Sequence, residues 1–275
     1  GNEGASAGHT AGILKENTEE RIPLAVQMKE TAINVQIWKS YHDIVDISLI
    51  SPAGVQIGPI PEVIGTQRFV VGDTEILLYY GEPSPLHVSQ EIFIEFLPKD
   101  SYITPGIWQF VLTPRKIVTG EYDLWLPREN VLNRGTAFRY PTERGTLTIP
   151  STSQRVISVG AYDSLTFAYA DFSGRGGLEG ESKPDLVAPG VDITAPTPSG
   201  IYQTFTGTSF ATPFVSGAAA LMMEWGIVRG NDPYLYGEKV KAYLRRGARP
   251  LPGFTEYPNP QVGYGALCLR DSLPE

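Results

Sequence analysis

Residues 207–213, GTSFATP, place a serine at the point where a loop is expected to become a helix. The small neighbours Gly207 and Thr208 would let a substrate backbone approach Ser209. The first turn of a helix leaves N–H groups without partners and carries a partial positive charge, which stabilises negative charge developing on a nearby oxygen. This is the setting of a nucleophilic serine. On the local pattern alone, however, a serine N-cap on a buried alanine-rich helix is the commoner explanation.

The elements around this serine alternate between strand and helix. We expect a helix over residues 209–225, dense in alanine and leucine and ended by Gly226. A last helix is expected over residues 233–246, ending at Gly247. Residues 156–160 are apolar nearly throughout, as in a parallel strand buried on both faces, and residues 183–193 carry a second short apolar run. This alternation predicts an α/β layer.

Residues 21–145 have a different texture. Seven or eight short runs of β-branched and aromatic residues are separated by Gly, Pro, Asp or Ser, which predicts an antiparallel β-sandwich of the jelly-roll kind. Residues 1–20 are glycine-rich and then polar, so we interpret them as a loop or as the tail of an element. The predicted domains are therefore 21–145 for the sandwich, and 1–20 with 146–275 for the α/β part.

Composition excludes several classes of protein. The chain has 275 residues with 30 acidic and 22 basic side chains, a formal net charge of −8, and it carries no basic run, which argues against nucleic-acid binding. The most apolar stretch, residues 215–223, is shorter than the roughly 20 residues that span a bilayer, so no membrane partner is expected. The one cysteine, Cys268, can form no internal disulfide and anchors no metal cluster. No signal peptide is visible.

Four segments together resemble a known family. In chain order, the segments are GNEG, VISVGAYD, KPDLVAPGVDI and GTSFATPFVSGAAAL. They are similar to segments of the subtilisin-like serine proteases, the subtilases, and they occur in the same order as in that family. The closing NPQVGYGALCL also resembles the end of subtilase catalytic domains. The resemblance covers residues 1–12 and about 146–270. It implies a partial subtilisin-like parallel-sheet domain and serine endopeptidase activity.

The resemblance also implies roles for particular residues. Ser209 would be the nucleophile, and the oxyanion would be held by the Asn2 side chain and the Ser209 backbone N–H. Gly1, Gly207 and Thr208 would contact the substrate. The simpler alternative for Asn2 is a turn residue beside glycine.

The catalytic Asp and His of the family both precede the oxyanion asparagine, and no residue here matches them. Of the three histidines, we interpret His42 and His87 as surface or loop residues, and His9 as a loop residue that could line the substrate cleft. A serine without a base is a weak nucleophile. We therefore expect this chain to be the C-terminal part of a longer enzyme, inactive alone and completed by a segment that bears Asp and His, with self-association as a further possibility.

A β-sandwich inserted after the oxyanion segment resembles the clostridial spore-germination proteases, which cleave and activate the precursor of a cortex-degrading enzyme. That resemblance implies an extracellular or spore-associated location and a protein or peptide substrate. Because some members of that group have lost catalytic residues, a non-catalytic pseudoprotease or binding scaffold is the rival hypothesis.

The aromatic residues of the predicted sandwich allow two interpretations. They could form a carbohydrate-binding face, or they could fill the core or pack between domains, which the alternation around the tryptophans favours. The aromatics concerned are Trp38, Tyr79, Tyr80, Trp108 and Trp125. No cofactor is expected. Calcium is implied by the family resemblance only, since we find no Asp-rich loop with ligand spacing and interpret Asp163, Asp171 and Asp192 as turn or cap residues.

Overall fold

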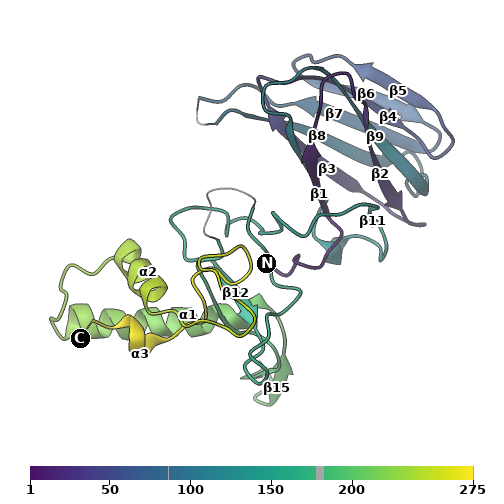
Figure 1. Cartoon of the computed structure of the whole chain (residues 1–275). Coiled ribbons are helices and arrows are strands. Elements are labelled where there is room, and N and C mark those ends of the chain that lie inside the picture. The colour runs from purple at the N-terminus through teal and green to yellow at the C-terminus, as the bar shows by residue number, and fades with distance from the viewer. Residues whose placement is uncertain (86, 178–182, 275) are drawn as a thin grey trace. The chain divides into compact units, whose positions relative to one another are not determined.

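The computed structural model describes residues 1–85, 87–177 and 183–274. The chain divides into two compact units, which are described separately (Figure 1). Ala7–Thr142 form what we call the sandwich unit, and Gly1–Ser6 together with Glu143–Glu275 form the α/β unit. Of the range expected for the α/β part, residues 178–182 and 275 lie outside the described residues.

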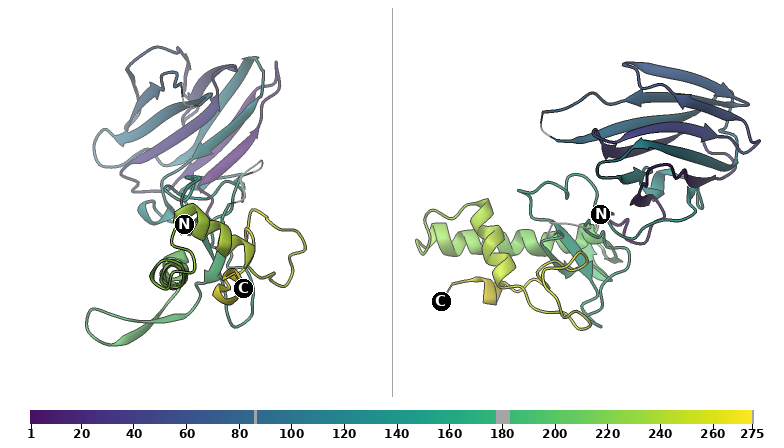
Figure 2. Two further views of the ribbon diagram at one scale, coloured as in Figure 1. Left: turned by 90° about the vertical axis from the view of Figure 1, so that its left-hand side faces the viewer. Right: turned by 45° about the horizontal axis from the view of Figure 1, so that its top comes forward.

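The sandwich unit contains two antiparallel sheets (Figure 2). The six-stranded sheet has the order β1-β10-β3-β8-β7-β6, with β1 at His9–Ile13, β10 at Glu121–Trp125, β3 at Ile33–Ser40, β8 at Ser89–Pro98, β7 at Thr74–Tyr80 and β6 at Thr66–Val71. The five-stranded sheet has the order β11-β2-β9-β4-β5, with β11 at Ala137–Phe138, β2 at Glu20–Val26, β9 at Gly106–Lys116, β4 at Ile44–Ile50 and β5 at Gln56–Ile60. A short 3₁₀ turn, Glu129–Val131, follows β10.

Strict alternation builds the core of this unit. In β3 every second residue from Ile33 is buried, and β8 alternates in the same way, because successive side chains of a strand point to opposite faces. Trp108 is completely buried, and its ring packs edge-on against Phe96 with centroids 5.1 Å apart. The expected β-sandwich therefore has a single continuous apolar layer between its sheets.

The structure corrects our interpretation of residues 1–20. Residues 9–13 form β1, which pairs with β10 in full register, and residues 20–26 form β2. Glycine content misled the interpretation, because an edge strand needs few large side chains when its partner strand supplies the hydrogen bonds. The boundaries between the two units accordingly fall after Ser6 and after Thr142, not at 20/21 and 145/146.

The α/β unit is built around two parallel strands and one long helix. Its elements are β12 at Val159–Tyr162, β13 at Leu186–Pro189, β14 at Ile193–Pro196, β15 at Tyr202–Phe205, α1 at Thr208–Met223, a π-helical turn at Glu224–Val228, α2 at Gly237–Arg246 and α3 at Leu269–Ser272. β12 and β13 pair in parallel and are buried almost throughout, as predicted. The buried side of α1 (Ala211, Val215, Ala218 and Met222) packs against this pair of strands.

Both predicted helices differ from the observed ones at an end. The long helix does not stop at Gly226, because the Arg229 N–H bonds the Glu224 carbonyl five residues back and the two side chains form an ion pair of 2.7 Å. The last helix begins at Gly237 rather than Pro233, since Tyr236 has extended backbone and Leu235 closes a turn onto Asp232.

One described helix has the length and composition to cross a membrane. It is the run Thr208–Val228, which is longer than the 215–223 stretch on which we based our expectation. Core helices of soluble proteins can have the same length and apolar composition. Its first residues belong to the polar site described next.

Candidate active site

Ser209 is the second residue of α1 and is exposed to solvent. Its N–H belongs to the first turn, where helix geometry provides no partner. Within the described part of the chain, the structure records no hydrogen bond for the Ser209 hydroxyl. Pro213 lies four residues further on and lacks the N–H that would bond the Ser209 carbonyl. The serine therefore has a solvent-accessible hydroxyl and an unengaged N–H at the positive end of a helix.

Asn2 lies beside this serine, although 206 positions separate it from Thr208. Its Oδ1 accepts hydrogen bonds from the Thr208 N–H at 3.0 Å and from the Thr208 hydroxyl at 2.8 Å. Because both bonds engage Oδ1, the orientation of the amide is fixed and Nδ2 is left as a donor. Within the described residues Nδ2 has no recorded partner.

Gly207 makes the close approach of Asn2 possible. Its φ of 150° is one that other residues rarely adopt, and a Cβ placed there would lie 3.1 Å from Asn2 Nδ2. The Gly207 N–H is in turn bonded to the Gly190 carbonyl at 2.8 Å, just beyond the end of β13. The buried parallel strands thus fix the loop that presents Ser209.

A second set of backbone bonds holds the Asn2 segment. The Gly4 N–H bonds the Phe172 carbonyl at 2.9 Å, and the Gly174 N–H bonds the Gly1 carbonyl at 3.0 Å. A side chain on Gly4 would collide with the Ser173 carbonyl oxygen. Asn2 is therefore anchored on both sides, by residues 172–174 and by Thr208.

Asp185 is the electrostatic centre of the α/β unit and lies at the start of β13. Its carboxylate is completely buried and accepts a bond from the Ser158 N–H at 2.5 Å. Three cations surround it: Lys183 at 3.5 Å, Lys241 at 3.1 Å, and Arg245, whose Nε lies 2.8 Å from Oδ1. Burial lowers the pKa of Lys183 below its ordinary value, although the Asp185 charge acts in the opposite direction. The cluster fastens α2 to the strands that support the Ser209 loop.

All three histidines belong to the sandwich unit, and residues 1–6 and 143–275 contain none. His9 is buried in β1, where its Nε2 lies 2.9 Å from Asp123 Oδ1 and its ring stacks on Trp125. Its placement in a loop was therefore wrong. His42 is an exposed turn residue and His87 is an exposed loop residue bridged to Ser84, in agreement with our interpretation.

The remaining predicted residues have the following surroundings. Gly1 packs against the Thr148 side chain, and Thr208 is buried with its hydroxyl on Asn2. Substrate contact by Gly1, Gly207 and Thr208 stays a prediction. The role of Thr208 as the anchor of Asn2 was not predicted, and its place next to the serine is the signal that the sequence offers for it.

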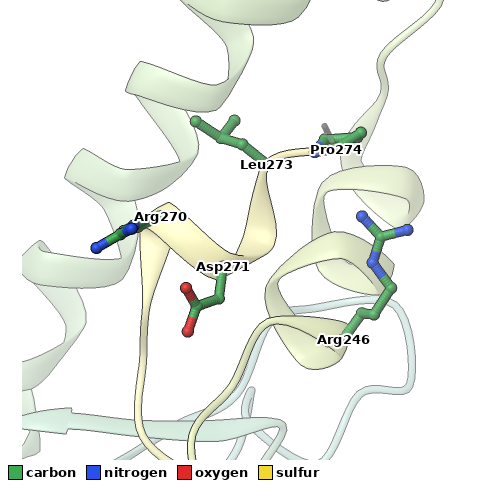
Figure 3. A pocket seen from close by; sticks show the side chains of 5 residues that line it. All are labelled: Arg246, Arg270, Asp271, Leu273 and Pro274. Atoms are coloured by element: carbon green, nitrogen blue, oxygen red, sulfur yellow. The ribbon is translucent and has the colours of Figure 1, made fainter.

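Among residues 1–85, 87–177 and 183–274, no three His, Cys, Asp or Glu side chains are grouped to hold a metal ion. The Asp163 carboxylate instead accepts bonds from the Leu165 N–H and the Thr166 hydroxyl, both at 2.8 Å, and so closes a turn. A pocket of about 690 Å³ lies at the C-terminal end of the chain and contains neither Asn2 nor Ser209 (Figure 3). Its lining residues are Arg246, Arg270, Asp271, Leu273 and Pro274.

Comparisons with known proteins agree with the geometry. The model of the subtilase family matches residues 140–265. The serine protease AprX of Bacillus subtilis is 34% identical over 150 residues, which are 47% of this chain and 32% of AprX. An intracellular serine protease of Paenibacillus polymyxa is 38% identical over 105 residues, 37% of this chain and 30% of that protein.

A solved structure, the Clostridium perfringens CspB protease, is similar over 98% of this chain and 56% of its own, with 40% identity and a TM-score of 0.91. The match spans about a third of the length of AprX and of the Paenibacillus polymyxa protease. Residues 140–265 thus match the subtilase family of serine proteases, and this part of the chain holds Ser209 next to Thr208, the residue that binds Asn2.

Proposed function

We propose that the chain carries the nucleophile and the oxyanion hole of a serine endopeptidase. Ser209 Oγ attacks the carbonyl carbon of a peptide bond, and the carbonyl oxygen becomes an oxyanion that accepts hydrogen bonds from Asn2 Nδ2 and the Ser209 N–H. Collapse of this intermediate expels the amine and leaves an acyl-Ser209 ester, which water then hydrolyses. The observation that carries the proposal is the Asn2 carboxamide held through Oδ1 by Thr208, with its Nδ2 left as a donor.

A base must still take the proton from Ser209. Because the α/β unit contains no histidine, we infer that a polypeptide segment outside residues 1–275 supplies the catalytic His and Asp. The outer side of α1 supports this inference, since an apolar surface of this kind normally packs against another element. The exposed apolar side chains of α1 and of the π-helical turn that follows it are Phe214, Leu221, Met223, Ile227 and Val228, the last of them 78% exposed. The 275-residue chain alone should therefore have no peptidase activity.

The sandwich is proposed to be an insertion of jelly-roll type within the subtilase domain. The two chain segments that flank it, residues 1–4 and 145–146, both bond to the single segment 172–176, so its ends lie close together. A domain whose ends are close can be inserted without disturbing the surrounding fold. With the likeness to CspB, this favours an extracellular or spore-associated germination protease that acts on a protein precursor.

Fluorophosphonate labelling tests the proposal. Native full-length enzyme should be labelled at Ser209, Ser209→Ala should not be, and Ser216→Ala on the same helix should be labelled like the native enzyme. Removal of an oxyanion-hole asparagine costs a subtilisin roughly 10²–10³-fold in turnover, and Asn2→Ala should cost a similar factor. Labelling that persists in Ser209→Ala would refute the role of Ser209.

A non-catalytic scaffold is the second candidate, and the observation in its favour is the lack of any histidine in the α/β unit. It predicts a full-length protein that folds and binds the precursor protein but takes up no label. Labelled native enzyme with measurable peptidase activity excludes it.

A further inference from the structure

The outer face of the six-stranded sheet combines aromatic rings with carboxylates and amides. We expected the five aromatics in the core or between domains, and the structure divides them. Tyr80 and Trp108 are buried, whereas Trp38 and Trp125 are partly exposed and Tyr79 is 38% exposed. Phe93 of β8 lies on the same face as Tyr79, because it is directly opposite Tyr79 on the neighbouring strand β7. We call this surface the aromatic face.

Two rows of side chains cross the aromatic face at right angles to the strands. In one row, Trp125, Gln36, Phe93 and Tyr79 stand on β10, β3, β8 and β7 in turn. In the next row, Trp38 lies directly between Asp123 and Glu91. Neighbouring strands are about 4.8 Å apart, so the first row extends over about 14 Å. No β-bulge interrupts the register of these four strands, and the face is therefore regular.

Asp123 on the aromatic face is paired with His9, but several other polar groups there are not used by the fold. In the part of the chain that the structure describes, the side chains of Gln36, Asn34, Glu91 and Glu95 have no recorded hydrogen-bond or ion-pair partner. Among lysines and arginines, the six strands place one on this face, Arg68 of β6, and it is paired with Glu75 at 2.5 Å. The face therefore offers hydrogen-bond acceptors and amide donors beside flat rings, and its charge repels anionic polymers.

These properties favour a neutral glycan over a peptide. A peptide that adds to a sheet bonds to the backbone of an edge strand, but β10, β3, β8 and β7 are paired on both sides. An extended β-1,4-linked chain of pyranose rings instead presents flat C–H faces to aromatic rings and a rim of hydroxyls to carboxylates and amides. We propose that the aromatic face binds a neutral β-1,4-linked polysaccharide strand laid across β10, β3, β8 and β7.

Titration calorimetry of the 275-residue chain with cellohexaose and chitohexaose tests this proposal. At least one of the two should bind. Removal of one aromatic platform by Trp38→Ala or Tyr79→Ala should weaken binding roughly 2–10-fold, the range given by 0.5–1.5 kcal/mol per aromatic contact. The double variant should lose measurable binding. Tyr102→Ala, at an aromatic residue 46% exposed in the loop after β8, is the matched control and should bind like the native chain.

Two further arms make the outcome decisive. Hexalysine tests the rival occupant, a basic peptide, whose binding would depend on the Glu91 charge and be abolished by Glu91→Gln. Near-ultraviolet circular dichroism of each variant shows whether the core is packed as in the native chain. Tyr79→Ala should keep the native fold, because Tyr79 is 38% exposed. No binding of either hexasaccharide, binding unaffected by the double variant, or binding of hexalysine alone overturns the proposal.

Discussion

Replacing Asp185 by alanine removes the only carboxylate in contact with Lys183, Lys241 and Arg245 among the described residues. The side chains of Lys183 and Lys241 are 5% and 9% exposed, so water cannot take the place of the lost partner. Breaking a buried pair in this way costs about 3–5 kcal/mol, because uncompensated charge stays in the interior. At about 3–4 °C per kcal/mol for a unit of this size, the melting temperature of the α/β unit should fall by roughly 10–20 °C.

The ion pair between Arg249 and Asp271 provides the control within the same unit. Its side chains are 58% and 40% exposed, and removal of an exposed pair changes stability by about 0–1 kcal/mol. Thermal unfolding of Asp185→Ala, Asp185→Asn and Asp271→Ala should therefore separate into two classes. The asparagine variant keeps an acceptor for the Ser158 N–H but not the charge, so it should lose most of what alanine loses. If Asp185→Ala melts within a degree or two of Asp271→Ala, the cluster does not hold α2 to the strands.

Three further perturbations test the scaffold and the site. Burial alone would raise the pKa of Asp43, but bonds from the backbone N–H groups of residues 118–120 lower it below its ordinary value. The charged Asp43 carboxylate therefore stabilises the fold fully above the unfolded pKa near 3.9, and this stabilisation is lost as pH falls through the lower folded pKa. The urea midpoints of Asp43→Asn and the native chain should differ at pH 7 and converge in acid. Gly207→Ala forces a side chain into a φ of 150° beside Asn2 Nδ2 and should cost about 1–3 kcal/mol, together with most labelling of Ser209 in the full-length enzyme; normal labelling would contradict the packing. Trp108→Ala should destabilise the sandwich unit by about 3–5 kcal/mol in urea unfolding, and a cost under 1 kcal/mol would show that its buried ring is not needed.

Local patterns were sufficient for elements whose partners lie next to them in the core. The short runs of β-branched and aromatic residues predicted sandwich strands such as β3. The apolar run at residues 156–160 predicted a parallel strand buried on both faces, which the structure places at Val159–Tyr162. The phase of alternation was harder to assign. In β10 the buried residues are Tyr122 and Leu124, so Trp125 lies on the outer face with Asp123. The charge of Asp123 indicates in the sequence that this face is exposed. We nevertheless assigned Trp125 to the buried face because tryptophan is a large apolar residue.

The site itself could not be derived from local sequence, because its decisive contact joins residues that are 206 positions apart. Family resemblance suggested the pairing of Asn2 with Ser209, and the backbone explains how it persists across an intervening unit. The stretches before and after the sandwich unit, residues 1–4 and 145–146, bond to the same segment of the α/β unit. The Gly4 N–H bonds the Phe172 carbonyl, and the Thr146 N–H bonds the Arg175 carbonyl. The two stretches of the α/β unit that lead to the sandwich unit are therefore anchored on one strip of chain. The length of the sandwich unit adds only a slowly growing loop-closure entropy to the formation of the site, since that term rises with the logarithm of the number of residues enclosed.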